Sequence, residues 1–335
     1  MKKWALAALV ALTSMGVIGC QSGGETAGSG AATGTGTAAN TGKKVRIGVS
    51  IPAADHGWTA GVVYWANEAM KLYPDVEWTL ATAEDPAKQI SDIETMMAKG
   101  IDGLVVLATE SAPLTPIAKQ VAERGILLVN VDRGFLEPVA DVFIEGDNKA
   151  FGRKSAQFIV ERLRGQGNIV ILEGIPSTVN TDRVEAAKEV FAAAPGIRIL
   201  DSQSGMWNRT KAHEVMQAML VKHPKIDAVW ASDDDMALGV EQAIREAGRQ
   251  NEMWILGGAG MKDIVKRVMD RDPLYPANIT YPPSMIAMGI QIAVSTLRDG
   301  NREKIAQFQP SHLLIDVELI TPENAQRFYF PDSIY

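Results

Sequence analysis

Two short polar motifs in the sequence carry the residue types that bind polar ligands. Asp132-Arg133 follows the apolar run 125–131, and Asp233-Asp234-Asp235 follows the β-rich run 226–232. A carboxylate accepts hydrogen bonds and a guanidinium donates several in a fixed fork, so such side chains can hold one ligand together. A structural ion pair is the alternative for the first motif. A helix N-cap is the alternative for the second, and it accounts for Asp234 and Asp235 but leaves Asp233 free.

Two tryptophans lie in polar surroundings that could belong to the same site. Trp58 follows the first β-rich run, and Trp207 lies in a polar loop between Gly205 and Asn208. The flat aromatic face suits the apolar face of a sugar or polyol ring, while the ring hydroxyls need the charged partners described above. The mixture therefore predicts a site for a carbohydrate-like ligand. A core position is the alternative for Trp58.

Other kinds of site find little support in the sequence. The acidic motif lacks the alternating oxygen ligands and the central glycine of a calcium loop. Gly257-Gly258-Ala259-Gly260 lies between a strand and a helix but lacks the lysine of a P-loop and the dinucleotide fingerprint. No nucleophile elbow is present, and the single cysteine, Cys20, lies outside the expected fold. The histidines lack the spacing of zinc ligands; they are His56, His213, His223 and His312.

The elements that must position these residues alternate between strand and helix. The β-rich runs are 45–51, 76–81, 103–107, 126–131, 142–145, 168–173, 197–201, 226–232 and 253–258. The segments with helical spacing are 58–72, 86–98, 113–124, 149–163, 182–191, 209–221, 236–247 and 261–269. Such alternation predicts an α/β protein with parallel sheets and right-handed crossovers.

Two series of about five strands each predict two doubly wound lobes. The tail, with β-rich or helical segments at 277–281, 283–297 and 312–318, is too short for a third lobe and is expected to complete the other two. Ligands of open parallel sheets bind beyond the carboxyl ends of the strands. The polar residues that follow the strands are therefore expected to converge.

The first 42 residues are expected to lie outside the fold. Lys2 and Lys3 precede the apolar run 4–18, and the segment ends in Val-Ile-Gly-Cys, so residues 1–20 have the layout of a secretory signal. This ending resembles a bacterial lipobox, in which Cys20 is acylated and tethers the protein to a membrane. A secreted protein with an unmodified cysteine is the alternative. Residues 21–42 are rich in Gly, Ala, Thr and Ser, which predicts a flexible linker.

Composition limits the remaining choices for residues 43–335. Their length favours two lobes, and without a cysteine in this range no disulfide can hold them together. The chain carries 33 basic and 40 acidic side chains, a formal net charge of −7. This negative charge argues against a nucleic-acid partner, which would need a basic face.

From about residue 45 to 318 the chain resembles the type I periplasmic sugar-binding proteins of bacterial ABC importers, the ribose-binding cluster in particular. The motifs that carry the resemblance are VNVDR at 129–133, EGDN at 145–148 with Gly152, AVWASDDDMALG at 228–239, and Tyr-Pro-Pro at 281–283. The resemblance implies two Rossmann-like lobes joined by three crossings, near Gly146, Tyr281 and Gln309. The first lobe would comprise 43–146 and 282–309, and the second 147–281 and 310–335.

The same resemblance assigns roles to several residues of this sequence. It implies that Asp132 and Arg133 bind ligand hydroxyls and that Asp233 faces them from the other lobe. Trp58 and Trp207 would take the two aromatic positions that sandwich the ring. It also implies contacts from the loop that contains Asp55 and His56.

Three positions depart from the pattern of that family. Thr181, next to Asn180, stands where the ribose-binding relatives carry a second arginine, and Ala259 stands where they carry an aspartate. Tyr281 replaces a glutamine that reaches in from the hinge. The sequence thus predicts that two charged partners are missing and that the ligand is another monosaccharide, a polyol, a cyclitol or another small polar ring.

The expected function is ligand capture without chemistry, cofactor or metal. Lobe closure would trap the ligand, and the lipid-anchored monomer would deliver it to the permease subunits of an ABC importer. One alternative output is a receptor for a chemotaxis or sensor-kinase system. A glycosidase that uses Asp132 and Asp233 is a second alternative, and it would require the two carboxyls at set separations.

Overall fold

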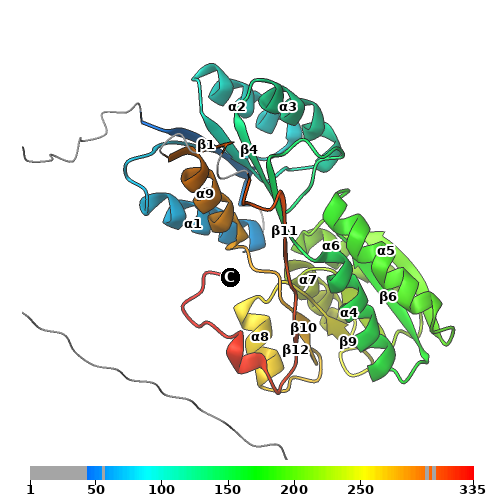
Figure 1. Cartoon of the computed structure of the whole chain (residues 1–335). Coiled ribbons are helices and arrows are strands. Elements are labelled where there is room, and N and C mark those ends of the chain that lie inside the picture. The colour runs from blue at the N-terminus through cyan, green and yellow to red at the C-terminus, as the bar shows by residue number, and fades with distance from the viewer. Residues whose placement is uncertain (1–43, 55–56, 299–301, 304–306) are drawn as a thin grey trace, which may run out of the picture. The chain divides into compact units, whose positions relative to one another are not determined.

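The computed structural model describes residues 44–54, 57–298, 302–303 and 307–335, in which strands and helices alternate as predicted (Figure 1). The strands are β1 (Arg46–Pro52), β2 (Glu77–Ala83), β3 (Gly103–Val106), β4 (Leu127–Val131), β5 (Val142–Gly146), β6 (Gly167–Glu173), β7 (Ile197–Ser204), β8 (Ala228–Ala231), β9 (Trp254–Leu256), β10 (Asn278–Ile279), β11 (His312–Ile315) and β12 (Leu319–Ile320). The helices are α1 (Gly57–Lys71), α2 (Pro86–Ala98), α3 (Ser111–Glu123), α4 (Asn148–Arg162), α5 (Thr178–Ala192), α6 (Arg209–Lys222), α7 (Asp234–Glu246), α8 (Lys262–Met269) and α9 (Met285–Leu297), with a short 3₁₀ turn η2 (Ala325–Arg327).

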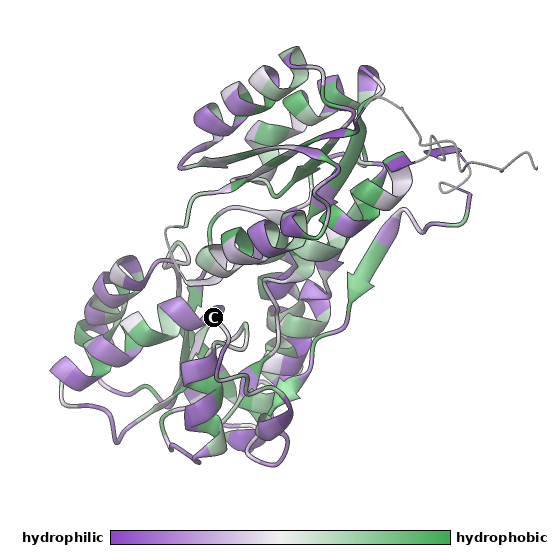
Figure 2. Cartoon of the chain, turned by 90° about the vertical axis from the view of Figure 1, so that its left-hand side faces the viewer, coloured by the Kyte–Doolittle hydropathy of each residue, from purple (hydrophilic) through white to green (hydrophobic). Residues whose placement is uncertain are grey.

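The first lobe is built on a parallel sheet of six strands in the order β11-β5-β4-β3-β1-β2. Side chains of β3 alternate between its faces, as the two-residue period of a strand requires. Leu104 and Val106 pack with α2 and α3, whereas Val105 packs in the larger core with α1 and α9. Figure 2 shows that the ribbon of the sheet is mostly hydrophobic. The helices on either side of it carry hydrophilic residues on the sides that face away from the sheet. Each fully buried side chain of this size contributes roughly 1.5–3 kcal/mol.

The second lobe contains a parallel sheet of four strands in the order β7-β6-β8-β9, rather than the five strands predicted. Its central residues Ile169–Leu172 are fully buried, which explains why this stretch reads as a continuous apolar run. The helices α4 and α5 pack against each other, as do α6 and α7. A separate antiparallel pair, β10 and β12, completes this part of the chain.

The chain passes three times between the sheets. It leaves the first sheet after β5, returns between β10 and α9, and leaves again between β11 and β12. The third passage differs from the prediction, because β11 pairs with β5 from His312 to Ile315 and so extends the first sheet. The passage thus lies beyond Ile315 and not near Gln309. The other lobe boundaries stay a prediction.

Element boundaries agree with the predicted ranges within a few residues, with one informative exception. Helix α5 was expected to begin at Asp182 but begins at Thr178, because Ser177 caps it and its Oγ accepts a hydrogen bond from the backbone N–H of Asn180. The residues 178–181, expected in a loop, therefore form the first turn of the helix. This shift changes which side chains of α5 reach the site.

Several predictions concern residues outside those that the structure describes. These are the signal 1–20 with Cys20, the linker 21–42, and Asp55 and His56 of the first strand-end loop. Among the described residues, no helix combines the length and apolar character needed to span a bilayer. The described His, Asp and Glu side chains form no group suited to hold a metal ion.

Candidate ligand-binding site

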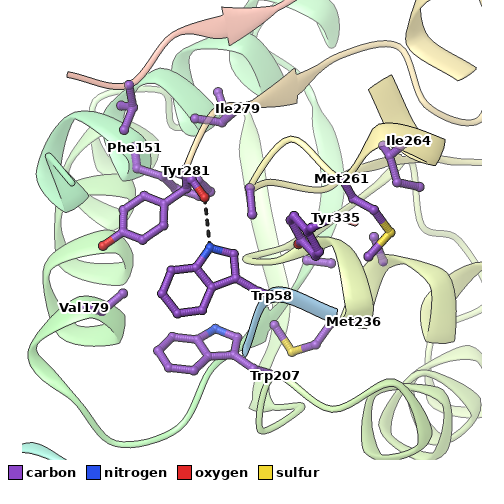
Figure 3. Close-up of a cluster of buried hydrophobic side chains, with 14 of the residues drawn as sticks. Trp58, Phe151, Val179, Trp207, Met236, Met261, Ile264, Ile279, Tyr281 and Tyr335 are labelled. Carbon is purple, nitrogen blue, oxygen red and sulfur yellow. Dashed lines mark hydrogen bonds between the residues drawn. The ribbon is translucent and has the colours of Figure 1, made fainter. Parts of the chain in front are cut away.

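One small cavity collects most of the predicted site residues. Nine residues line it: Trp58, Asp132, Arg133, Val179, Arg183, Trp207, Asp233, Ala259 and Tyr281. They follow strands of both sheets, at the carboxyl ends where ligands of parallel sheets bind. The cavity measures about 20 Å³, which is room for about one water molecule. Figure 3 shows three of the lining residues, Trp58, Trp207 and Tyr281, close to one another.

Asp132 and Arg133 enter the cavity from the end of β4. Asp132 has a φ of 67°, a left-handed conformation that is unfavourable for a residue with a Cβ atom. The Nη1 atom of Arg133 donates to the carbonyls of Ala108 and Thr109 over 3.1 and 2.8 Å. Nε of Arg133 lies 3.8 Å from Oδ2 of Asp132. The two opposite charges thus lie next to each other, and both side chains line the cavity.

The three aspartates of the acidic motif make different contacts. Asp233 is the N-cap of α7, where its Oδ1 accepts a hydrogen bond from Met236 N over 2.8 Å, and it also lines the cavity. The N-cap alternative is therefore confirmed for Asp234 and Asp235, which lie in the first turn of α7, but it is wrong in setting Asp233 apart, because Asp233 is the cap itself. Asp235 accepts a hydrogen bond from Gly57 N over 3.0 Å, which links α7 of the second lobe to α1 of the first.

The side chain of Asp234 holds the glycine-rich loop 257–260, which follows β9, in its conformation. Its carboxylate accepts hydrogen bonds from the N–H groups of Gly258 and Met261, both over 2.8 Å, and from the Asn278 amide over 2.7 Å. Burial raises the pKa of Asp234 well above its ordinary value. The loop 257–260 thus folds around a carboxylate of the protein itself, and this contact holds Ala259 at the cavity wall.

Arg183 is a cavity residue that the sequence analysis missed. It comes from α5 and is 3% exposed. Its Nε donates to Oδ1 of Asn148 over 3.0 Å, and its Nη1 donates to the Ser232 carbonyl over 2.7 Å. The guanidinium lies 3.9 Å from the ring centroid of Phe151 and 4.3 Å from that of Tyr281, close enough for cation–π attraction.

The presence of Arg183 corrects the prediction of two missing charged partners. The second guanidinium is there, two positions beyond Thr181. Asn180 and Thr181 do not line the cavity, and Oδ1 of Asn180 accepts a hydrogen bond from Gly174 N over 2.7 Å. The signal that could have found Arg183 is the helix start at Ser177, because it places Val179 and Arg183 four residues apart on one face.

Tyr281 joins the crossing between the lobes to Asp132. Its hydroxyl donates to Oδ1 of Asp132 over 2.5 Å, and its carbonyl accepts from Nε1 of Trp58 over 2.9 Å. Burial and the neighbouring carboxylate raise the pKa of Tyr281 well above its ordinary value, so the hydroxyl remains a donor. The ring packs so closely on Gly146 that a Cβ atom there would lie 2.1 Å from Cε2 of Tyr281. A glycine at 146 is therefore required by this contact.

Trp207 forms another wall of the cavity. Met206 and Trp207 have φ values of 59° and 50°, and this unusual turn directs the indole over the backbone of Gly174. The Arg133 guanidinium lies 5.0 Å from the centroid of the Trp207 ring. Figure 3 shows Trp207 next to Trp58, with Tyr281 on the other side of Trp58.

Backbone strain concentrates at this site. Six described residues other than glycine have a positive φ, and three of them line the cavity: Asp132, Trp207 and Ala259. Each such residue costs on the order of 1–3 kcal/mol, and strained residues tend to cluster where a ligand is held. The strain supports a binding role for the cavity over a purely structural one.

The charges that line the cavity balance. The carboxylates of Asp132 and Asp233 stand against the guanidinium groups of Arg133 and Arg183. Such a set offers several donors and several acceptors without a net charge, so it suits an uncharged ligand with many hydroxyl groups. The indole rings add flat apolar surfaces of the kind that pack on the C–H face of a sugar ring.

A second and larger cavity of about 610 Å³ adjoins the first. Ala259 and Tyr281 line both cavities, and Tyr335 from the last described segment lines the larger one. Of the predicted site residues that the structure describes, Tyr281 is the only one that contributes to it. The convergence of charged and aromatic side chains therefore identifies the smaller cavity as the candidate site.

Comparison with protein families gives one match over most of the chain. The family model described as the periplasmic binding protein domain matches residues 47–301. The D-ribose/D-allose-binding protein of Pseudomonas aeruginosa is 31% identical over 219 residues, which cover 64% of this chain and 68% of that protein. The ribose import binding protein of Bacillus subtilis is 30% identical over 218 residues, which cover 65% of this chain and 70% of that protein.

Solved structures agree with these matches. The fructose-binding periplasmic domain of a hybrid two-component system has a TM-score of 0.75 and 29% sequence identity to this chain. The alignment covers 85% of this chain and 93% of that domain. The similarity extends over both lobes, so the arrangement of the two sheets has a solved counterpart.

Proposed function

We propose that the chain, which belongs to the type I sugar-binding branch of the periplasmic binding protein family, captures a monosaccharide or a related polyol or cyclitol. Ligand capture would involve no bond making or breaking. The observation that carries the proposal is the convergence of two carboxylates, two guanidinium groups and two indoles on one cavity between the lobes. The balanced charge of this set favours a neutral ligand over a sugar phosphate or a sugar acid.

Binding would require the lobes to move apart and close again. A cavity of about 20 Å³ is too small for a monosaccharide, so the site must open before a ligand enters. Gly57 N donates to Asp235 across the lobes over 3.0 Å, and Gly134 N donates to Thr178 Oγ1 over 2.9 Å. These contacts belong to a closed form, and a ligand that bridges the lobes would stabilise a similar form in which the cavity is wider.

The favoured output is delivery to an ABC importer. The ribose import binding protein among the relatives supports this choice. The family implies a location outside the cytoplasm, where the closed protein would dock on permease subunits. Acylation of Cys20 after removal of residues 1–20 would keep the protein at the membrane on the linker 21–42, as a monomeric lipoprotein.

A receptor role is the second candidate, and one observation favours it. The fructose-binding domain that resembles this chain belongs to a hybrid two-component system. In such a role the closed form would be recognised by a sensor protein instead of a permease. The binding chemistry of the cavity would be the same in both cases.

Calorimetric titration with D-ribose, D-allose, D-fructose, xylitol and myo-inositol tests the proposal. We expect at least one of them to bind and to raise the melting temperature in proportion to RT ln(1 + [L]/Kd). The bound compound should be recovered unchanged after long incubation, and so should a methyl glycoside of the binding sugar, whose glycosidic bond a glycosidase would cleave. Mass spectrometry of the freshly purified protein would identify a compound that stays in the cleft. If no compound of this class binds, and none co-purifies, the proposal is wrong.

A further inference from the structure

Asn148 lies behind the cavity and ties two of its side chains together. Its amide oxygen accepts a hydrogen bond from Nε of Arg183 over 3.0 Å. Its amide nitrogen donates to the hydroxyl of Tyr281 over 3.2 Å and to Oε2 of Glu145 over 3.3 Å. One planar amide thus contacts three side chains, and these bonds fix the directions of Arg183 and Tyr281.

The same series of hydrogen bonds continues to the protein surface. Glu145 is 9% exposed, and its Oε1 lies 3.0 Å from Nε2 of His312. The His312 side chain is 52% exposed and stacks on Phe143, with ring centroids 5.1 Å apart. At the inner end, Tyr281 donates to Asp132 in the cavity. A continuous path therefore leads from solvent at His312 to the cavity at Asp132.

The members of this path belong to the three passages between the sheets. Glu145 and Asn148 flank the first passage, after β5, and Tyr281 lies at the second, after β10. His312 begins β11, which leads into the third. The path thus runs through the segments that must bend if the lobes open, and its inner end contacts a residue that lines the site.

We infer that Glu145 and Asn148 are positioning residues that set the orientation of Arg183 and Tyr281, and that ligand affinity follows the protonation state of Glu145. The inference rests on the proposed function, because Arg183 and Tyr281 matter to affinity only if the cavity binds the ligand. Neither Glu145 nor Asn148 lines the cavity. They act through the side chains they hold.

The charge of Glu145 is open to change near neutral pH. Burial raises its pKa to about 7, although the hydrogen bonds from His312 and Asn148 act in the opposite direction. The titratable groups that face it are His312 from β11 and Asp132 from the end of β4, and the negative charge of Asp132 also raises the pKa. Arg183 lies one hydrogen bond farther on, through Asn148.

The sign of the effect follows from the hydrogen bonds. A charged carboxylate holds the Asn148 amide more strongly than a neutral carboxyl group does. Arg183 and Tyr281 are therefore best oriented when Glu145 is deprotonated. By linkage, ligand binding releases protons near pH 7, and affinity falls as the pH is lowered through the pKa of Glu145.

Calorimetric titrations at pH 8.5 and pH 5.5 test this with the tightest binder among D-ribose, D-allose, D-fructose, xylitol and myo-inositol. We expect the Kd of the wild type to rise about tenfold at the lower pH. Glu145→Gln keeps the shape of the side chain without its charge, so its Kd should be weak and equal at both values. Glu246→Gln is the matched control, because Glu246 also contacts a histidine, His213 over 2.7 Å, but lies on the surface of α7.

His312→Gln gives a readout that a purely structural role would not change. The hydrogen bond from His312 lowers the pKa of Glu145, so loss of the imidazole should move the midpoint of the pH profile to higher pH. His213→Gln should leave the midpoint where it is in the wild type. Asn148→Ala should weaken binding at both pH values, since the link to Arg183 is then lost.

The outcomes separate this inference from the proposed function. A ligand that binds with a pH-independent Kd, or with the same profile in Glu145→Gln, would overturn the inference and leave the proposed function intact. If no compound binds, the proposed function fails. The free energy of unfolding, measured as a function of pH, then still reports the protonation state of Glu145. A folded-state pKa above the unfolded value makes stability fall as the pH rises from about 4.5 to 7. Identical unfolding profiles of the wild type and Glu145→Gln would then overturn the inference.

Discussion

The two lobes each bring one aspartate and one arginine to the cavity, but they do so by different routes. In the first lobe Asp132 and Arg133 are adjacent in sequence and leave the end of one strand together. In the second lobe Asp233 caps α7, while Arg183 comes from the second turn of α5. The same chemistry is thus assembled once from neighbours in sequence and once from residues brought together only by folding.

The two arginines also differ in how they are held. Arg133 donates to two backbone carbonyls, whereas Arg183 donates to the Asn148 side chain and the Ser232 carbonyl and stacks on two aromatic rings. The hydrogen bonds of the first-lobe arginine thus go to backbone that follows β3, and its guanidinium also lies beside Asp132 and the Trp207 ring. The second-lobe arginine depends on the passages between the lobes as well, so it is the one that hinge movement can reorient.

The largest expected effect tests whether the two aspartates are equivalent. Asp132→Ala and Asp233→Ala should each lower ligand affinity by about 3 kcal/mol, more than 100-fold, because each removes one of the two carboxylates that balance the guanidinium groups lining the cavity and that can accept hydrogen bonds from the ligand. Calorimetric titration with the best binder of the sugar panel measures this. Asp270→Ala, at an exposed pair with Lys266, should bind like the wild type. If either of these two variants bound the ligand as tightly as the wild type, the aspartate of that lobe would not belong to the binding site.

The second-largest expected effect is a difference in stability between variants of the two arginines. Arg183→Met should lower the free energy of unfolding by about 3 kcal/mol, since it leaves Asn148 and the Ser232 carbonyl without their buried donor. Arg133→Met should cost less, about 1–2 kcal/mol, because its hydrogen bonds go to backbone carbonyls and Asp132, which loses a neighbouring charge, keeps the hydrogen bond from Tyr281. Chemical denaturation monitored by circular dichroism gives both values. Equal losses would contradict the different roles assigned to the two side chains.

A smaller effect compares the two tryptophans. Trp58→Phe removes the N–H that donates to the Tyr281 carbonyl and should weaken binding by about 1 kcal/mol, roughly fivefold. Nε1 of Trp207 has no hydrogen-bond partner among the described residues, so Trp207→Phe keeps the aromatic face and should lose less than half as much. Titration with the same sugar distinguishes the two. The reverse order of affinities would show that Trp207, and not Trp58, depends on its N–H.

The smallest expected effect concerns the link between the lobes. Asp235→Ala removes the acceptor for Gly57 N and should lower affinity about threefold, because the closed form loses one hydrogen bond between the lobes. Arg209 contacts the other oxygen of Asp235 from within the second lobe over 3.3 Å. Arg209→Ala should therefore leave the affinity unchanged. If both variants lost the same affinity, Asp235 would act through its contact with Arg209 in the second lobe and not through its hydrogen bond to the first lobe.

Most of the fold could be predicted because it follows local patterns. The alternation of apolar strands and amphipathic helices predicts the two lobes, and the position of polar residues after strands predicts Asp132, Arg133, Trp207 and Asp233 as site residues. Two of the details that escaped prediction concern how elements are placed. The strand β11 joined the first sheet, and α5 began four residues early at its Ser177 cap. The second detail concealed Arg183, since the helix phase decides which side chains face inward.

By itself the sequence determined the elements, their order and the polar residues that follow the strands, because periodicity and turn chemistry act over a few residues. Only the tertiary structure decided which of those residues share a cavity and what charge the cavity carries. The order of the strands in the sheets and the passages between the lobes determine the residues and the charge of the cavity. The same features place Arg183 beside Tyr281, which is nearly a hundred positions away in the sequence. Local patterns contain no information about such distances along the chain, so the balance of charge appeared only after folding.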